Sequence, residues 1–175
     1  MSYIPSRQRE TFHLVFTGTY EHAIDAKHRL AIPSEIRRGL QRGLGAGEGD
    51  AIVLYVVLGG DDVVCLYTEP GYLRLAEDMR QCRLDPEELL AYEEMFFAMS
   101  SRIEMDKAGR IRLPEHLLKQ TGLSGEVTLT GAGDHLKIRD RVAWQTRIES
   151  VLKDKPQILV NPRIMLGRRQ DGGGA

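Results

Sequence analysis

The sequence predicts an α+β protein made of two similar β-rich repeats with a pair of helices between them. Three observations in the 175-residue chain support this prediction. A nine-residue pattern occurs twice, at 25–33 and at 106–114. A second shared pattern follows each copy, at 60–66 and at 132–138. Between the copies, over 69–99, apolar residues recur at the spacing of a helix rather than alternating as in a strand.

The first pattern reads DAKHRLAIP in copy one and DKAGRIRLP in copy two. Asp, Arg and Pro stand at the same places in both copies. After each Arg, apolar residues alternate with small or polar ones, which is typical of a β-strand. Pro33 and Pro114 then end the strand and can open a short helix at its first position. Each copy therefore begins with a strand, a tight turn and a second strand.

Two further strands and a closing helix are expected in each copy, over 51–58, 63–67 and 71–82 in copy one and over 126–130, 135–139 and 141–153 in copy two. Tyr72, Leu75, Ala76 and Met79 share one helical face. Copy one is longer, and we place its extra residues in a glycine-rich loop at 43–50.

Copy one has an additional helix that begins after Asp85, because an Asp cap followed by Pro86 and two acids is a strong start signal. Residues 69–99 carry three basic and eight acidic residues, so we expect an acidic helical hairpin between the repeats. A repeat of about 45 residues is too small for a core of its own. Either the two copies complete one another, or the chain interleaves with another chain.

Composition excludes several classes of protein. Hydrophobic residues make up 42% and charged residues 28% of the chain, which is ordinary for a globular protein. No apolar run approaches the ~20 residues of a membrane helix, and the first residues lack the apolar stretch of a signal peptide. Two cysteines, Cys65 and Cys82, do not make a disulfide scaffold. We therefore expect a cytoplasmic protein without a membrane partner.

Nothing specific in the sequence points to catalysis. The histidines and cysteines lack zinc-site spacing, the glycine-rich stretch at 43–47 is not followed by the Lys-Ser/Thr of a phosphate loop, and the acids of 87–94 fit a solvated helix face better than a catalytic cluster. The sequence predicts no enzyme, no cofactor, no metal and no small-molecule substrate. Cys65 lies in an expected strand, and we assign it to the core.

The repeated Asp-x-x-x-Arg rises above this background, and it has two interpretations. Asp25 and Asp106 suit a strand end, where a carboxylate accepts hydrogen bonds from the turn that follows. Gly109 permits a positive φ in that turn, and His28 occupies the equivalent position. The pattern alone favours an Asp–Arg ion pair that only locks the hairpin. The alternative is a rigid turn that presents Arg and Lys to phosphates or guanine.

Basic surroundings shift the balance towards the second interpretation. The net charge is −1, but the basic residues gather in the two repeats and the acidic ones between them. Copy one is followed by Arg37, Arg38 and Arg42, and copy two is surrounded by Arg102, Arg112 and Lys119. Two basic hairpins in one chain favour a multivalent anionic target, of which double-stranded DNA is the commonest.

In these motifs the chain resembles the MraZ family of transcriptional regulators. Its first repeat is similar to a pattern in this chain that begins with Phe16, Gly18 and Tyr20 and continues with Asp25-x-Lys27-x-Arg29 and Ile32-Pro33. The run SRIEMDKAGRIRLP at 101–114 looks like its second. Gly122-Leu123, the turn at Gly131 and the sequence up to Trp144 continue the match. The resemblance covers about 14–152 and departs from the family at His28, where a glycine is usual.

The resemblance implies two repeats of the SpoVT/AbrB type, in which swapped hairpins interleave into a shared β-barrel, here as a pseudo-dimer within one chain. It implies a first repeat at 18–71, a linking helical hairpin at 72–99, a second repeat at 100–143, and a C-terminal helix with a flexible tail at 144–175. Family members form ring-shaped homo-oligomers and bind short repeated DNA boxes upstream of their own operon, often a division and cell-wall cluster. The expected location is the cytoplasm, at the nucleoid.

The resemblance also implies the DNA-binding residues, with the aspartates orienting the turns and Arg29 and Arg110 making direct contacts: Asp25, Lys27, His28, Arg29, Asp106, Lys107 and Arg110. One alternative stays open, a swapped-hairpin scaffold that binds another protein through 69–99, in which fold would not imply function. The apolar part of the tail after 154 either adds a strand to a neighbouring subunit or belongs to a floppy basic tail.

Overall fold

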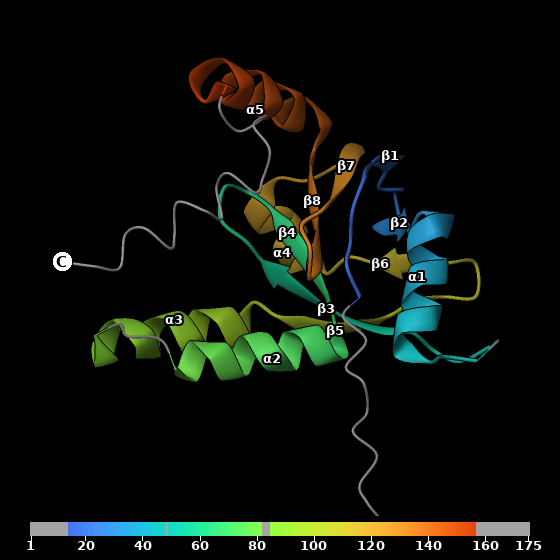
Figure 1. Ribbon diagram of the computed structural model, residues 1–175, viewed down its shortest axis with the longest axis horizontal. Helices are drawn as coiled ribbons and strands as arrows, with labels where there is room; N and C mark the ends of the chain where they lie inside the picture. Colours follow the sequence, from blue (N-terminus) through green and yellow to red (C-terminus); the bar gives the residue numbers. More distant parts are fainter. Residues whose placement is uncertain (1–13, 48, 82–84, 157–175) are drawn as a thin grey trace, which may run out of the picture. The chain divides into compact units, whose positions relative to one another are not determined.

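The computed structural model describes residues 14–47, 49–81 and 85–156 (Figure 1). The described residues contain eight strands and five helices: β1 (Thr19–Ala23), β2 (Arg29–Ala31), α1 (Ser34–Leu44), β3 (Val53–Leu58), β4 (Val64–Thr68), α2 (Glu69–Arg80), α3 (Pro86–Ala98), β5 (Ser101–Glu104), β6 (Arg110–Arg112), α4 (Glu115–Thr121), β7 (Glu126–Gly131), β8 (His135–Asp140) and α5 (Arg141–Asp154). The chain divides into two compact units between Asp140 and Arg141. The expected α+β composition is confirmed.

The strands of the two copies are interleaved. Six of them form an antiparallel sheet in the order β1-β7-β8-β4-β3-β5. The first strand of copy one, β1, therefore pairs with β7 of copy two, and β5 of copy two pairs with β3 of copy one. The remaining strands, β2 and β6, form a separate antiparallel ribbon with one strand from each copy. The two copies thus complete one another within a single chain.

The hydrophobic core is shared in the same way. Leu30 of β2 lies opposite Ile111 of β6, and both side chains are completely buried. Their neighbours in one continuous cluster come from both copies and include Ile32, Leu40, Leu54, Val56, Leu66, Leu113, Leu117, Val127, Leu129, Leu136 and Ile138. Each fully buried aliphatic side chain contributes roughly 1.5–3 kcal/mol. Most of the folding free energy therefore depends on both repeats being present together.

A second apolar cluster joins α2 and α3 to the sheet. Figure 1 shows the two helices side by side. Tyr72 of α2 stacks on Tyr55 of β3 with ring centroids 4.2 Å apart, and Phe96 of α3 stacks on the same Tyr72 at 5.7 Å. Cys65 belongs to this cluster. Burial raises the pKa of its thiol, so the expectation that Cys65 is a core residue is confirmed.

Local hydrogen bonds explain where the helices begin and end. The predicted start of α3 is confirmed, because Asp85 Oδ1 accepts from Glu87 N at 3.0 Å. The expected start of α2 at residue 71 was two residues late, because Thr68 caps the helix by accepting from Gly71 N at 3.2 Å. Pro33 and Pro114 precede their helices rather than occupy the first position. None of the helices in the described part of the chain combines the length and apolarity that a bilayer crossing requires.

The glycine-rich segment after α1 also differs from the expectation by two residues. The helix continues through Gly43 and ends at Leu44, where Gly45 takes a left-handed conformation with φ of 63° and closes the last turn. The loop therefore begins at Gly45 rather than at Gly43. The segment still separates α1 from β3, which is the place that the comparison of the two copies predicted for the extra residues.

One close backbone approach fixes the crossing of the two copies. The segment before β1 passes directly over Gly131 at the end of β7, and Gly131 N donates to Gly18 O at 2.9 Å. A β-carbon on Gly131 would collide with main-chain atoms of Phe16 and Thr17. Main-chain atoms inside a paired segment cannot rotate away as a side chain can. The glycine is therefore required by its neighbours rather than by its own dihedral angles.

Replacing Gly131 with Ala should lower the free energy of unfolding by about 2 kcal/mol or more, because the strand segment at Phe16 must move to accommodate the methyl group. Urea denaturation followed by circular dichroism measures the loss. Gly60→Ala is the matched control, since nothing lies within 4 Å of a β-carbon there. Equal stability of the two variants would show that the crossing is not tightly packed.

Candidate nucleic-acid interface

Turn one, defined as Asp25–Arg29, is held by a single carboxylate. Asp25 Oδ1 accepts from the backbone N–H groups of Lys27 and Arg29, each at 2.9 Å. Asp25 Oδ2 accepts from Nε of Arg29 at 2.8 Å and lies 2.8 Å from its Nη2. The main chain closes the same turn, with His28 N donating to Asp25 O at 2.8 Å and Asp25 N donating to Arg29 O at 2.9 Å. One aspartate therefore fixes both the backbone and the arginine.

Turn two, defined as Asp106–Arg110, repeats this geometry almost atom for atom. Asp106 Oδ1 accepts from the N–H groups of Ala108 and Arg110, each at 2.9 Å, and Oδ2 accepts from Nε of Arg110 at 2.9 Å. Gly109 N donates to Asp106 O at 2.8 Å. The Asp–Arg ion pair expected from the pattern is thus present in both copies.

Both turns need a left-handed residue at their fourth position. Gly109 has φ of 76°, and His28 has φ of 59° at the equivalent place. Glycine adopts this conformation without steric cost, whereas a residue with a β-carbon does so at roughly 1–2 kcal/mol. The prediction that His28 takes the position of the glycine is confirmed. Turn one is therefore strained where turn two is not.

The two turns stand at opposite ends of the β2–β6 ribbon. The carbonyl of His28 accepts from Leu113 N, and the carbonyl of Gly109 accepts from Ile32 N, each at 2.9 Å. Each turn is thus bonded to the strand of the other copy. Along the ribbon the turns are four residues apart, which corresponds to about 14 Å.

Hydrogen bonding keeps both aspartates ionised. The Arg29 side chain and its backbone N–H lower the pKa of Asp25 from 3.8 to about 2. In turn two the backbone N–H of Arg110, with its side chain, lowers the pKa of Asp106. The Arg29 and Arg110 side chains remain partly exposed, at 33% and 38%. A guanidinium has five N–H donors, so each arginine keeps donors for a further partner while one edge is held.

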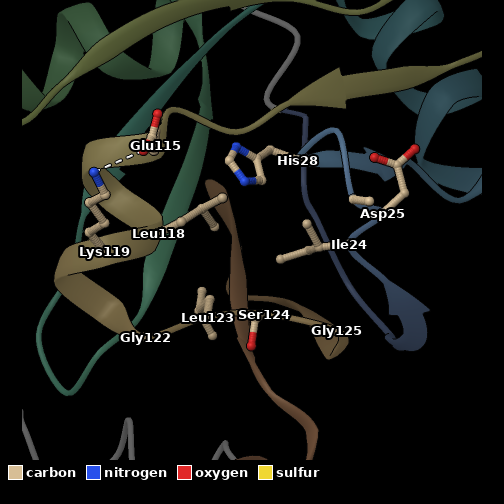
Figure 2. A pocket seen from close by; sticks show the side chains of 11 residues that line it. Ile24, Asp25, His28, Glu115, Leu118, Lys119, Gly122, Leu123, Ser124 and Gly125 are labelled. Carbon is tan, nitrogen blue, oxygen red and sulfur yellow. Dashed lines mark ion pairs between the residues drawn. The ribbon is translucent and has the colours of Figure 1, made fainter.

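Each turn borders an open groove against the helix that follows the other copy's ribbon strand. We call the groove at turn one groove one; it lies between Asp25–His28 and α4. In Figure 2 the His28 imidazole points into it, towards Leu118 and Glu115, whereas the Asp25 carboxylate points away. Glu115 forms an ion pair with Lys119 at 2.8 Å across one turn of α4. Groove one is therefore half apolar and internally neutralised.

We call the groove at turn two groove two; it lies between Met105–Gly109 and α1. Arg37, Arg38 and Lys107 line it. The Arg37 side chain lies directly over Gly109, so that an added β-carbon there would be 2.7 Å from Nε. The sequence placed Arg37 and Arg38 beside copy one, but strand exchange brings them to the turn of copy two. Predicting that Arg37 and Arg38 lie at turn two would have required knowing that β2 of copy one pairs with β6 of copy two.

The predicted site residues are thus brought together within each turn but not across the molecule. Asp25, Lys27, His28 and Arg29 form one end of the ribbon, and Asp106, Lys107 and Arg110 form the other. Lys27 and Lys107 are exposed. Among the described residues, no group of three or more potential ligands could hold a metal ion. Cys82 and the tail after 156 lie outside the described residues.

Comparison with known proteins finds transcriptional regulators among the relatives of this chain. A family model with the description "MraZ protein, putative antitoxin-like" matches residues 96–157. The chain is 33% identical over 135 residues to a transcriptional regulator MraZ of Kocuria rhizophila, which covers 77% of this chain and 87% of the relative. The relative from Heliobacterium modesticaldum is 32% identical over 130 residues, covering 74% and 84%. The relative from Herpetosiphon aurantiacus is 30% identical over 144 residues, covering 82% and 94%.

The depressed pKa of Asp25 is open to direct measurement. Because the folded-state pKa lies below the unfolded value, the carboxylate stabilises turn one fully above about pH 4 and loses this effect as pH falls towards 2. Carbon-13 NMR of the carboxyl group should give a midpoint near 2, and Arg29→Gln should raise it. Arg102→Gln, which removes an arginine paired elsewhere with Glu104, should leave it unchanged. An unshifted midpoint in the native chain would contradict the hydrogen bonding of the Asp25 carboxylate to Lys27 and Arg29.

The strain at His28 predicts an unusual order of stability. His28→Gly should be more stable than His28→Ala by about 1 kcal/mol, because only the alanine carries a β-carbon into a left-handed turn. Both variants lose the same imidazole, so packing in groove one cancels. Guanidinium unfolding at neutral pH measures the difference. If alanine were equally stable or better, the left-handed conformation would not be held in solution.

Proposed function

The chain belongs to the MraZ family of transcriptional regulators, and from this premise we propose that it binds double-stranded DNA in a sequence-specific manner through turns one and two. The family match and the relatives support a role in transcription regulation. The observation that supports DNA as the direct target is the aspartate–arginine pairing that occurs in both turns. Two exposed turns with the same carboxylate-held backbone each present a lysine and a partly exposed arginine.

In this mechanism the aspartates prepare the turns and the cations make the contacts. Asp25 and Asp106 hold Arg29 and Arg110 by Nε, which fixes the direction of the remaining guanidinium N–H donors before DNA arrives. A fixed fork loses little side-chain entropy on binding and suits O6 and N7 of guanine or a phosphate. Lys27 and Lys107, one in each turn, add phosphate contacts. His28 lies between Lys27 and the arginine and adds a contact or shapes the turn.

We assign the interleaved strands to two repeats of the SpoVT/AbrB swapped-hairpin type, at 18–71 and 100–143, separated by the helical hairpin 72–99 and followed by 144–175. The exchange of β1 and β5 between the copies supports this assignment. Each turn alone binds a short DNA box weakly. Subunits of a ring-shaped homo-oligomer then bind successive boxes upstream of the protein's own operon, and effective concentration multiplies the affinity. The site of action is the cytoplasm, at the nucleoid.

The hairpin of α2 and α3 supports both assembly and a second candidate function. Large apolar side chains are exposed on it, at 44–66% of their area: Leu73, Leu90, Tyr92, Met95 and Phe97. Five exposed apolar side chains on one helical hairpin favour an interaction surface there. They fit contacts between subunits. They fit equally a protein-binding scaffold, in which the acidic hairpin binds a basic partner and the turns have no DNA target.

Fluorescence anisotropy tests the proposal. The purified chain is titrated onto labelled duplex DNA from upstream of its own gene and onto a scrambled duplex, at several salt concentrations. Lys27→Ala/Lys107→Ala should weaken binding to both duplexes. It should also lower the slope of log affinity against log salt concentration by about 2, because binding releases fewer counterions when two phosphate contacts are missing. Arg29→Lys/Arg110→Lys should instead reduce the preference for the upstream duplex, because lysine cannot replace a bidentate fork.

The matched control is Arg74→Ala/Arg80→Ala, which removes two exposed positive charges from α2, away from both turns. It should bind both duplexes as the native chain does. If the native chain showed no preference for the upstream duplex, and the turn variants behaved as this control does, DNA recognition by the turns would be refuted. The search would then move to protein partners of the helical hairpin.

A further inference from the structure

The two ends of the ribbon differ in charge although their turns are alike. Groove one has Leu118 on its helical wall, and its lysine is neutralised by Glu115. Groove two has arginines at the equivalent places on α1, since Arg37 corresponds to Leu118 and Arg38 to Lys119 when the repeats are aligned on Pro33 and Pro114. The repeat symmetry of the backbone is therefore not a symmetry of the binding surface.

The acids of groove two are already occupied by neighbours. The Asp106 carboxylate accepts from Arg110 and from two backbone N–H groups. The Asp50 carboxylate accepts from Gly47 N at 2.7 Å. Within the described residues, the side chains of Arg37, Arg38 and Lys107 form no ion pair, and Nε of Arg37 is buried without a hydrogen-bond partner. A buried guanidinium nitrogen without an acceptor is costly, and no carboxylate among the described residues pairs with these three cations to offset their charge.

Gly109 is what lets Arg37 take this position. The guanidinium end of Arg37 lies where any β-carbon at residue 109 would stand. At the other end of the ribbon His28 has a β-carbon, and its helix has a leucine in place of the arginine. The two differences match one another. Gly109, which has no side chain, leaves room for Arg37. His28, which has a large side chain, lies beside the smaller and uncharged Leu118.

We propose that groove two is a dedicated phosphodiester site, in which Arg37 and Arg38 from copy one, together with Lys107, bind successive backbone phosphates of the duplex next to turn two. This inference rests on the proposed function and refines it. Groove two anchors the DNA backbone without reading sequence, beside the sequence-reading Arg110 of turn two, whereas groove one, with its glutamate, makes no such contact. The groove is open, with a volume of about 790 Å³, as a site for a polymer backbone must be.

The test compares Arg37→Ala/Arg38→Ala with Arg74→Ala/Arg80→Ala in the anisotropy experiment. The groove variant should lose roughly ten-fold in affinity for upstream and scrambled DNA alike, and its salt slope should fall by about 2. Its ratio of upstream to scrambled affinity should stay as in the native chain. Because Arg37 is half-buried, Arg38→Gln alone, an exposed change, provides a variant that keeps the fold and should lower the slope by about 1.

Gly109→Ala tests the placement of Arg37 without removing a charge. It should weaken binding to both duplexes as loss of Arg37 does, whereas Gly122→Ala should not. Gly122 also has a left-handed φ, of 67°, but nothing lies within 4 Å of an added β-carbon there. Thermal melts establish that each variant is folded.

Three outcomes distinguish failure of the phosphate site from failure of the proposed function. If the native chain binds DNA and the lysine variants of the turns weaken it, but the Arg37/Arg38 variant matches the α2 control, the phosphate site is refuted and the proposed function stands. If the groove variant loses affinity only for the upstream duplex, the groove reads sequence and is not a backbone anchor. If the native chain has no affinity for either duplex, the proposed function and the phosphate site fail together.

Discussion

The antiparallel pairing of β2 with β6 is the contact on which the rest of the molecule depends. It brings Leu30 and Ile111 together at the centre of the core, with no exposed area on either side chain. Neither repeat has enough apolar surface to close around its own strands. The ribbon therefore joins the copies at the place where each turn ends. Because His28 and Gly109 each bond to the opposite strand, the position of one turn is set by the fold of the other copy.

A segment is usually held rigid by packing in the interior, which an exposed turn lacks. Here hydrogen bonds to one aspartate carboxylate hold each exposed turn rigid. Asp25 and Asp106 each satisfy two backbone N–H groups and one guanidinium edge. Exposed ion pairs contribute little to stability, so the value of this arrangement lies in geometry. Preorganised donors lose less freedom when a ligand binds. The ion pair does not exclude the second interpretation of the motif, since a pair that locks the hairpin also orients the arginine.

Sequence patterns predicted those features whose causes are local. The repeated aspartate and arginine lie four residues apart, so their pairing needs only the turn between them. Alternation, helical spacing, and the proline and cap signals together predicted the strands and helices from β1 to α5 by type. The positive φ of His28 followed from its alignment with Gly109. Helix ends were less accurate where a cap such as Thr68 lay outside the apolar pattern, because capping depends on one hydrogen bond rather than on periodicity.

Only the tertiary structure decided which turn each helix packs beside, since α1 borders turn two and α4 borders turn one. Arg37 and Arg38 follow turn one in the chain, yet they lie in the groove of turn two. Periodicity specifies which face of an element is buried, but not which of two similar partners it is buried against. That choice is made by the pairing of strands far apart in the chain, such as β1 with β7. The sequence by itself therefore determined the elements and the two aspartate–arginine pairs, and the pairing of strands between the copies determined at which end of the ribbon Arg37 and Arg38 lie.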